Sequence, residues 1–333
     1  MGKLSSHALP SFDSKDRKIL YELELDSRRS LDEIAKKAGL SKQTLHYRIQ
    51  RLVDEGVIAG FITAIDAAKL GYVDHEVWMQ LNELDEEKKK KGFIDFLIAH
   101  ENVMRVASCE GKFDIAISVL AENLVRFNAI FRAMLGKFPG CVEDYHVSVS
   151  YGLADYPRTH LIGDGKDRKP ALAGGEPKRP GLDHGDVKIL SALSKNARVP
   201  MVELAESAGV SPNTVRQKIT RLEREGVIQR YTIVLQHSKI GLRNYEVLAS
   251  VQNLTEEDEK GIEGFCRMNA YVTSMHKTVG RWDLDIAFDA VDSAHFQEFL
   301  TGFRSRFSNV IREFEYVPIL WVHKLDYLPM KSI

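Results

Sequence analysis

Residues 39–58 read GLSKQTLHYRIQRLVDEGVI, and residues 209–228 read GVSPNTVRQKITRLEREGVI. The two stretches belong to a longer repeat, because residues 12–60 align without gaps on residues 182–230 at an offset of 170, with 20 of the 49 positions identical. Later parts align more loosely, including Leu70-Gly71 with Ile240-Gly241. Copies this long indicate the duplication of a unit of about 145 residues, far longer than a solenoid repeat.

Each quoted stretch predicts a tight turn between two short helices. Apolar residues recur at helical spacing before and after it. Gly39 stands where a left-handed residue ends a helix, and Ser41 is placed to cap the next one. Gly209 and Ser211 repeat the arrangement, and Pro212 stands in a first turn, where proline is tolerated. The pattern favours a helix-turn-helix.

The second half of each copy alternates strands and helices. In the first copy we expect a strand over 76–81, a helix over 86–99, strands over 103–108 and 115–120, a helix over 123–137 and a strand over 142–150. The order βαββαβ is that of a ferredoxin-like sandwich, and residues 245–324 repeat it. The predicted fold class is α+β, with two winged helix-turn-helix domains alternating with two ferredoxin-like domains.

The domain boundaries follow from these patterns and from one shift in composition. Residues 156–181 hold four prolines, five glycines and six basic residues, which predicts a flexible linker. As coil it would span roughly 25–30 Å, enough for the two copies to pair within one chain. We therefore expect a tail over 1–11, helix-turn-helix domains over 12–66 and 182–236, and ferredoxin-like domains over 67–155 and 237–329.

The third helix of each copy is basic. Residues 41–52 and 211–222 each hold three cationic side chains and no acid. Outside the apolar stripe, their side chains can contact base edges and phosphates. The N-terminal part of a recognition helix faces the bases, so we expect base contacts from Lys42, Gln43, His46, Asn213, Arg216 and Gln217. Arg48, Arg51, Lys218 and Arg221 are expected to position the helix on the DNA backbone, and Tyr47 and Thr220 complete the predicted DNA-binding set.

Two alternatives stand beside this interpretation. The helix could be a solvated amphipathic helix that happens to carry three positive charges, and Arg48 could pair with a carboxylate of its own unit. If both helices bind DNA, their unlike outward faces predict unlike half-sites.

Both units resemble the Lrp/AsnC family of bacterial and archaeal regulators, although family members ordinarily carry one unit per chain. The resemblance implies a sequence-specific transcriptional regulator rather than an enzyme, with double-stranded DNA as its partner. The residues that carry it in the first copy are Asp16-x-x-Ile19-Leu20, Arg28, Ile34-Ala35, Gly39-Leu40-Ser41-x-x-Thr44, Arg48-Ile49-x-Arg51-Leu52, Glu55-Gly56-Val57-Ile58 and Gly111-x-x-Asp114.

The resemblance also implies that the ferredoxin-like halves are effector-binding and dimerisation domains of the RAM type. Such domains pair sheet to sheet, often bind an amino acid, and assemble into larger homo-oligomers. The expected effector residues offer glycines for close approach, cations for a carboxylate and acids for an ammonium group: Gly111, Lys112, Asp114, Gly280, Arg281 and Asp283. The alternative is a hairpin turn whose Asp caps main-chain amides and whose aromatic residue packs inward.

Composition excludes several other classes. With 46 Lys plus Arg against 47 Asp plus Glu, the net charge of -1 rules out binding nucleic acid through overall charge. The 3 cysteines and 11 histidines lack the spacing of a disulfide framework or a metal site. No segment has signal-peptide or membrane-span character. We therefore expect a cytoplasmic protein with no cofactor, no metal and no membrane partner.

Two further functions remain open. Siroheme decarboxylases share this architecture, and that family carries His, Tyr and Arg on the strand before the Gly-x-x-Asp position. Here the first copy has only Arg105 there, whereas the second has Tyr271 and His276 without a matching Arg, which disfavours the enzyme. The other is a protein-interaction module whose helix-turn-helix does not contact DNA.

Overall fold

The computed structural model describes residues 13–82, 87–163, 168–178 and 181–328. The predicted tail, the start of the helix expected at Glu86, and parts of the predicted linker lie outside these ranges. The elements of the first copy and the segment after it are α1 (Ser14–Leu25), α2 (Leu31–Ala38), α3 (Lys42–Asp54), β1 (Ile58–Ile65), η1 (Ala67–Leu70), β2 (Val73–Leu81), α4 (Glu87–Ala99), β3 (Val103–Cys109), β4 (Ile115–Ala121), α5 (Leu124–Lys137), β5 (Val142–Asp155), η2 (Thr159–Ile162) and β6 (Ala171–Gly174).

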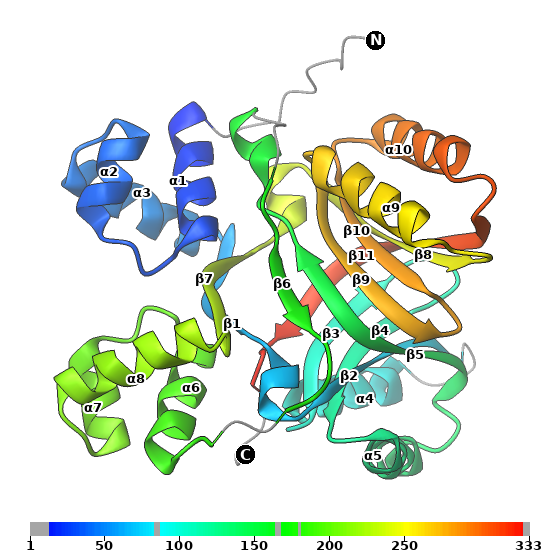
Figure 1. Cartoon of the computed structure of the whole chain (residues 1–333), viewed down its shortest axis with the longest axis horizontal. Coiled ribbons are helices and arrows are strands. Elements are labelled where there is room, and N and C mark those ends of the chain that lie inside the picture. The colour runs from blue at the N-terminus through cyan, green and yellow to red at the C-terminus, as the bar shows by residue number, and fades with distance from the viewer. Residues whose placement is uncertain (1–12, 83–86, 164–167, 179–180, 329–333) are drawn as a thin grey trace.

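The second copy repeats this order, as Figure 1 shows. The mixed α+β fold class and the winged helix-turn-helix arrangement predicted from the sequence are confirmed. The elements are α6 (His184–Lys195), α7 (Met201–Ala208), α8 (Pro212–Arg224), β7 (Ile228–Leu235), η3 (His237–Ile240), β8 (Arg243–Val251), α9 (Glu256–Met268), β9 (Val272–Gly280), β10 (Leu284–Ala290), α10 (Ser293–Arg306) and β11 (Ile311–Leu325).

The turn of each helix-turn-helix has the expected capping chemistry. Gly39 ends α2 with φ +64°, and the Ser41 hydroxyl accepts a hydrogen bond from Thr44 N at 3.1 Å. Gly209 ends α7 with φ +69°, and the Ser211 hydroxyl accepts from the main chain of α8. Glycine is favoured at these positive φ values because it has no Cβ.

The two helix-turn-helix units are interlocked through their wings. Strand β1 of the first copy pairs antiparallel with β7 of the second, with Phe61 opposite Ile233 (Figure 1). Ile233 lies in the core beneath α1, α2 and α3, whereas Ile65 of β1 lies in the core beneath α6, α7 and α8. Because each unit buries the other's wing, their relative placement is fixed by shared hydrophobic packing.

The ferredoxin-like halves join into one closed barrel. Eight antiparallel strands follow the order β2-β4-β3-β11-β8-β10-β9-β5, and β5 returns to β2. The two copies meet at two seams, β3 with β11 and β5 with β9. In Figure 1 the helices α4, α5, α9 and α10 lie outside the strands.

Side chains on each barrel strand alternate between the helices and the interior. On β2, Val77 and Met79 pack with residues of α4 and α5. Trp78 points the other way and packs with Phe113, Leu248 and residues of other strands, forming an apolar floor inside the barrel.

The segment predicted to be a flexible linker is ordered in its described parts. Residues 171–174 form β6, which pairs with β5. The buried Arg168 anchors the segment, because its guanidinium donates hydrogen bonds to five main-chain carbonyls. Burial disfavours the charged guanidinium and lowers the pKa of Arg168 to about 10. The carbonyls belong to Pro157, Cys266, Arg267, Asn269 and Val272.

No helix in the described part of the chain combines the length and apolar character needed to cross a bilayer.

Replacing Arg168 with methionine should lower the free energy of unfolding by about 2–4 kcal/mol, because several buried carbonyls lose their donor. The neighbouring Lys169 is exposed, so Lys169→Met is the matched control and should leave stability unchanged. Chemical denaturation monitored by circular dichroism measures both. Equal stability of the two variants would show that Arg168 does not anchor the segment.

Candidate nucleic-acid interface

Helices α3 and α8 each present a polar face to solvent. Gln43, His46 and Tyr47 are exposed on α3, with Tyr47 69% accessible. Lys42 is also exposed, and its Nζ lies 2.9 Å from Asp32 Oδ2. The exposed residues of α8 from the predicted set are Asn213, Arg216, Gln217 and Thr220. The predicted base-contacting residues are therefore accessible in both copies.

The predicted backbone-contacting cations of α3 form ion pairs at the start of α1, and their contact with DNA phosphates stays a prediction. Arg48 Nη1 lies 2.8 Å from Asp16 Oδ1 and 2.7 Å from Asp13 Oδ2. Arg51 Nη2 lies 2.7 Å from Asp16 Oδ2, and Asp16 is only 3% exposed. The hydrogen bonds from Arg48 to the two carboxylates raise the pKa of the guanidinium. These cations fasten the recognition helix to the first helix of its own unit.

The second copy preserves this anchor. Lys218 Nζ bonds Asp183 and lies 3.1 Å from Asp186 Oδ1, while Arg221 bonds the other oxygen of Asp186. Asp186 is fully buried. The hydrogen bond from Lys218 is the main cause that lowers the pKa of Asp183 to about 2. The duplication therefore retains an internal ionic contact at the positions where the sequence also allowed phosphate contacts.

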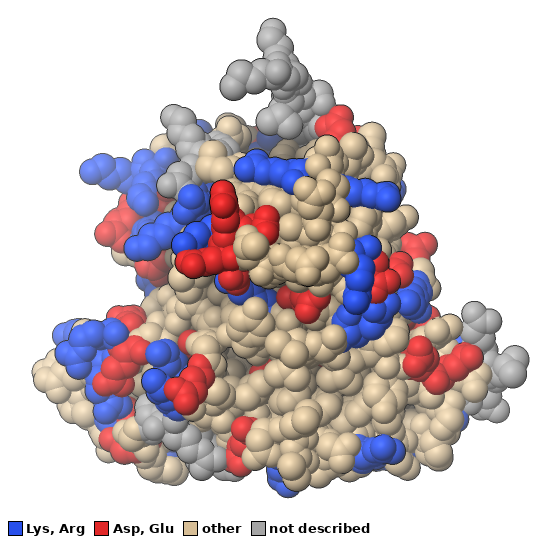
Figure 2. Space-filling view, turned by 45° about the vertical axis from the view of Figure 1, so that its right-hand side comes forward, with Lys and Arg blue, Asp and Glu red and all other residues tan. Residues whose placement is uncertain are grey.

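One predicted cation differs from the others. Arg216 is exposed on α8, and the described part of the chain offers it no ion pair. Charges are mixed over the face of the molecule seen in Figure 2, where Lys and Arg lie among Asp and Glu. On this face, positive charge is not gathered into one extended patch.

The predicted effector loops match the hairpin-turn alternative. Asp114 Oδ2 accepts a hydrogen bond from Leu81 N at 2.7 Å, and Asp283 Oδ2 accepts from Val251 N at 2.8 Å. The aromatic residue of each loop, Phe113 or Trp282, is 2% exposed. Gly111 and Gly280 have φ of +99° and +150°. The cations Lys112 and Arg281 pair with Glu315 and Glu313 of β11. Ligand binding by these residues stays a prediction.

The sequence interpretation missed a group of charged residues inside the barrel, which we call the barrel cluster. Its members lie above the apolar floor and line a cavity of about 430 Å³ that extends beneath the wings. Alternating acids on a strand that is otherwise largely apolar, as at Asp74 and Glu76, were the available sequence signal. The members are Asp74, Glu76, Arg105, Glu246, His276 and Asp285.

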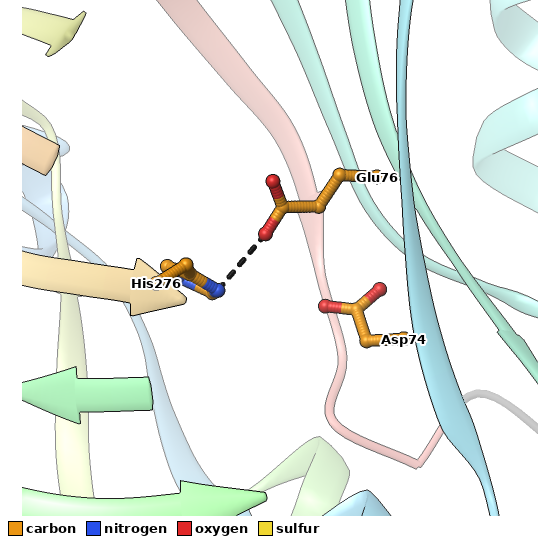
Figure 3. Close-up of side chains that lie close together, drawn as sticks. All are labelled: Asp74, Glu76 and His276. Carbon is orange, nitrogen blue, oxygen red and sulfur yellow. Dashed lines mark ion pairs between the residues drawn. The ribbon is translucent and has the colours of Figure 1, made fainter. Parts of the chain in front are cut away.

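Two ion pairs cross between the copies in this cluster. Arg105 Nη2 lies 2.8 Å from Glu246 Oε1, and His276 Nδ1 lies 2.9 Å from Glu76 Oε1 (Figure 3). Burial opposes the imidazolium, but the charge of Glu76 outweighs burial and raises the pKa of His276 to about 9. Burial raises the pKa of Asp74 to about 7 and that of Asp285 well above its usual value.

Comparisons with known proteins identify the units. The family model for winged helix-turn-helix DNA-binding segments matches residues 12–59 and 182–229. The proline dehydrogenase transcriptional activator of Rhizobium radiobacter is 31% identical over 138 residues, which cover 40% of this chain and 86% of the activator. The HTH-type transcriptional regulator FL11 of Pyrococcus abyssi is 31% identical over 141 residues, 42% of this chain and 89% of the regulator.

The fold of the whole chain also has a counterpart. The siroheme decarboxylase NirDL superposes with a TM-score of 0.61 over 96% of this chain and 94% of that chain, at 14% sequence identity. At this identity the likeness concerns the fold alone.

The repeated winged helix-turn-helix segment and the regulators that match one copy confirm the resemblance inferred from the sequence. The chain belongs to the Lrp/AsnC family of DNA-binding transcriptional regulators, in a tandem form in which one polypeptide carries the unit twice.

Proposed function

We propose that each chain acts as a pseudo-dimer on DNA, with α3 and α8 reading two different half-sites. The observation that carries the proposal is the interlocked pair of wings. Because β1 and β7 pair and each is buried in the other unit, the two recognition helices are held in one fixed relation. A helix-turn-helix dimer needs such a relation, since its half-sites are separated by a set number of base pairs.

The duplication keeps the inward positions of the helices and changes the outward ones. Ile49, Arg51 and Leu52 recur as Ile219, Arg221 and Leu222. The outward pairs all differ: Gln43 with Asn213, His46 with Arg216, Tyr47 with Gln217 and Gln50 with Thr220. Arginine favours guanine, and asparagine and glutamine favour adenine, in the major groove. The chemistry of the two faces therefore supports different base preferences.

Selection of binding sites from random DNA should return a motif with two unlike halves. We expect unlike halves because α8 presents the exposed Arg216 to its half-site, whereas α3 has His46 at the aligned position. Sequencing of the bound pool measures the motif directly. A symmetric palindrome would contradict the proposal of two different reading heads.

Arg216→Ala should weaken binding to the selected site by about 1–3 kcal/mol and relax base preference in one half only. The control is Arg304→Ala, which removes an exposed arginine from α10, away from the helix-turn-helix units (Figure 1). Fluorescence anisotropy at several salt concentrations measures affinity and its salt dependence. Wild-type affinity of Arg216→Ala would remove this residue from the interface.

Arg221→Ala should act on stability instead. Asp186 is buried and would lose one of its two cationic partners, lowering the free energy of unfolding by about 1–3 kcal/mol. Arg216→Ala on the same helix serves as the matched control and should unfold like the wild type. Denaturant titration measures the free energy of unfolding of both variants. An unchanged midpoint for Arg221→Ala would argue against the internal anchor.

We further infer that a small metabolite, such as an amino acid, modulates the regulator and that chains assemble into higher homo-oligomers, as the family resemblance implies. At the predicted loops, Asp114 and Asp283 already accept main-chain hydrogen bonds. The ammonium group of an amino acid would therefore compete with these main-chain donors, and its carboxylate would depend on Lys112 and Arg281. Thermal-shift screening of free amino acids against wild type and an Arg281→Ala variant tests this, and the absence of any shift counts against it.

A second candidate, an enzyme of the siroheme decarboxylase type, is favoured by the chain-long fold likeness to NirDL. The barrel also brings Arg105 of one copy and His276 of the other into one cavity. Six carboxyl groups and three guanidinium groups line the same cavity, and the carboxyl groups would repel a carboxylate-rich tetrapyrrole. Anaerobic incubation with siroheme followed by a product assay distinguishes this enzyme from a regulator without that activity.

A protein-interaction module would instead show no salt-dependent gel shift with DNA.

A further inference from the structure

The barrel cluster carries more acid than base. It holds four carboxyl groups, one guanidinium and one imidazole, all facing the same cavity. The guanidinium of Arg105 is committed to Glu246. With every group ionised, two negative charges stay uncompensated in surroundings where desolvation makes them costly. Either protons or a bound cation must offset this charge.

Three members of the barrel cluster have the geometry of a cation site. Asp74 and Glu76 are separated by one residue on β2, so both side chains project from the same face of the strand. His276 reaches them from β9 of the other copy, and Figure 3 shows the three side chains converging. One ligand atom from each residue lies within 4.8 Å of the other two.

Oxygen atoms at this site lack hydrogen-bond donors. Glu76 is 6% exposed and Asp285 is 4% exposed, yet Glu76 Oε1 and Asp285 Oδ1 are buried and find no hydrogen bond among the described residues. Glu76 Oε1 has His276 as its ion-pair partner, with Nδ1 2.9 Å away. Asp74 Oδ1 also lacks a donor. Because a buried carboxylate oxygen without a partner is costly, the unused acceptors of Asp74 and Asp285 in a negative cavity point to a bound positive ion.

We propose that Asp74, Glu76 and His276 bind one divalent transition-metal ion per chain. An imidazole combined with carboxylates suits Zn²⁺, Mn²⁺, Fe²⁺ or Co²⁺, whereas Ca²⁺ and Mg²⁺ favour oxygen ligands alone. As a metal ligand the imidazole of His276 is neutral, so four carboxylates and one guanidinium leave three negative charges, and a divalent ion offsets two of them. Asp285, which pairs with His276 across β9 and β10, lies beside the site and supplies a further carboxylate near the ion.

The internal repeat explains why one ion is expected rather than two. Gly71 aligns with Gly241 at an offset of 170, and Gly111 aligns with Gly280 at 169. Asp74, Glu76 and His276 then correspond to Asn244, Glu246 and Ala107. The site formed by Asn244, Glu246 and Ala107 thus lacks one carboxylate and the imidazole. Its one acid, Glu246, is paired with Arg105. The ion would join β2 to β9, and thus one copy to the other, at a single place in the barrel.

The test uses the untagged full chain, freed of metal with a chelator and then dialysed against Zn²⁺ or Co²⁺. Elemental analysis should find one ion per chain, and thermal unfolding should shift upwards with metal concentration, because an ion that binds only the folded chain stabilises it. Asp74→Asn and His276→Ala should each lower metal affinity by about 100-fold or more. This loss exceeds the one expected for a residue that only hydrogen-bonds to a metal ligand.

His146→Ala is the matched control. This histidine also sits beside an acid, with its Nε2 3.9 Å from Asp144 Oδ2, but it does not line the cavity. It should retain one ion per chain. Asp74→Asn preserves side-chain shape, so it remains informative if circular dichroism shows that His276→Ala is misfolded. A wild-type chain that retains no ion after dialysis would overturn the proposal. So would folded Asp74→Asn with wild-type metal affinity.

Discussion

The pairing of strands between the two copies is the constraint on which the rest of the structure depends. A four-stranded ferredoxin-like sheet has two open edges, and exposed edges invite association with other chains. Here β3 pairs with β11 and β5 pairs with β9, so each copy covers both edges of the other. The eight strands therefore close into a barrel. Closure creates an interior with an apolar floor around Trp78 and the charged barrel cluster above it.

The same principle operates in the DNA-binding half at a smaller scale. The wings β1 and β7 complete each other and fill each other's hydrophobic cores. Inside each unit, a buried aspartate on the first helix, Asp16 or Asp186, holds the recognition helix through two cations. With the framework fixed in this way, the outward residues of α3 and α8 are free to differ. Under the proposed function, fusion into one chain ensures that the two different recognition helices are always present together.

The features carried by local sequence could be predicted. The Gly39 and Ser41 signals located the helix-turn-helix, and the alternation of apolar residues located the strands and helices of the ferredoxin-like halves. The 20 identities between residues 12–60 and 182–230 are enough to reveal the duplication. These features depend on neighbouring residues and on periodicity, which a single sequence displays directly.

Contacts between distant residues could not be predicted in the same way. Arg51 and Asp16 are 35 positions apart, and Arg168 reaches carbonyls about 100 positions away, so no local pattern announces either contact. Prolines and glycines made residues 156–181 resemble a flexible tether, although the pairing of β6 with β5, the side chain of Arg158 and the buried side chain of Arg168 hold the described parts in place. The barrel cluster escaped notice because Glu76 and His276 come together only when two copies close a barrel.

The central claim is that one chain holds two recognition helices with different base preferences. The most direct measurement is site selection from random DNA with a variant whose second helix carries the first helix's outward face, made by Asn213→Gln, Arg216→His, Gln217→Tyr and Thr220→Gln. The account predicts that the wild type selects two unlike half-sites and that the variant selects a palindrome of the first. An unchanged motif would contradict it, because α8 would then not be reading its half of the site.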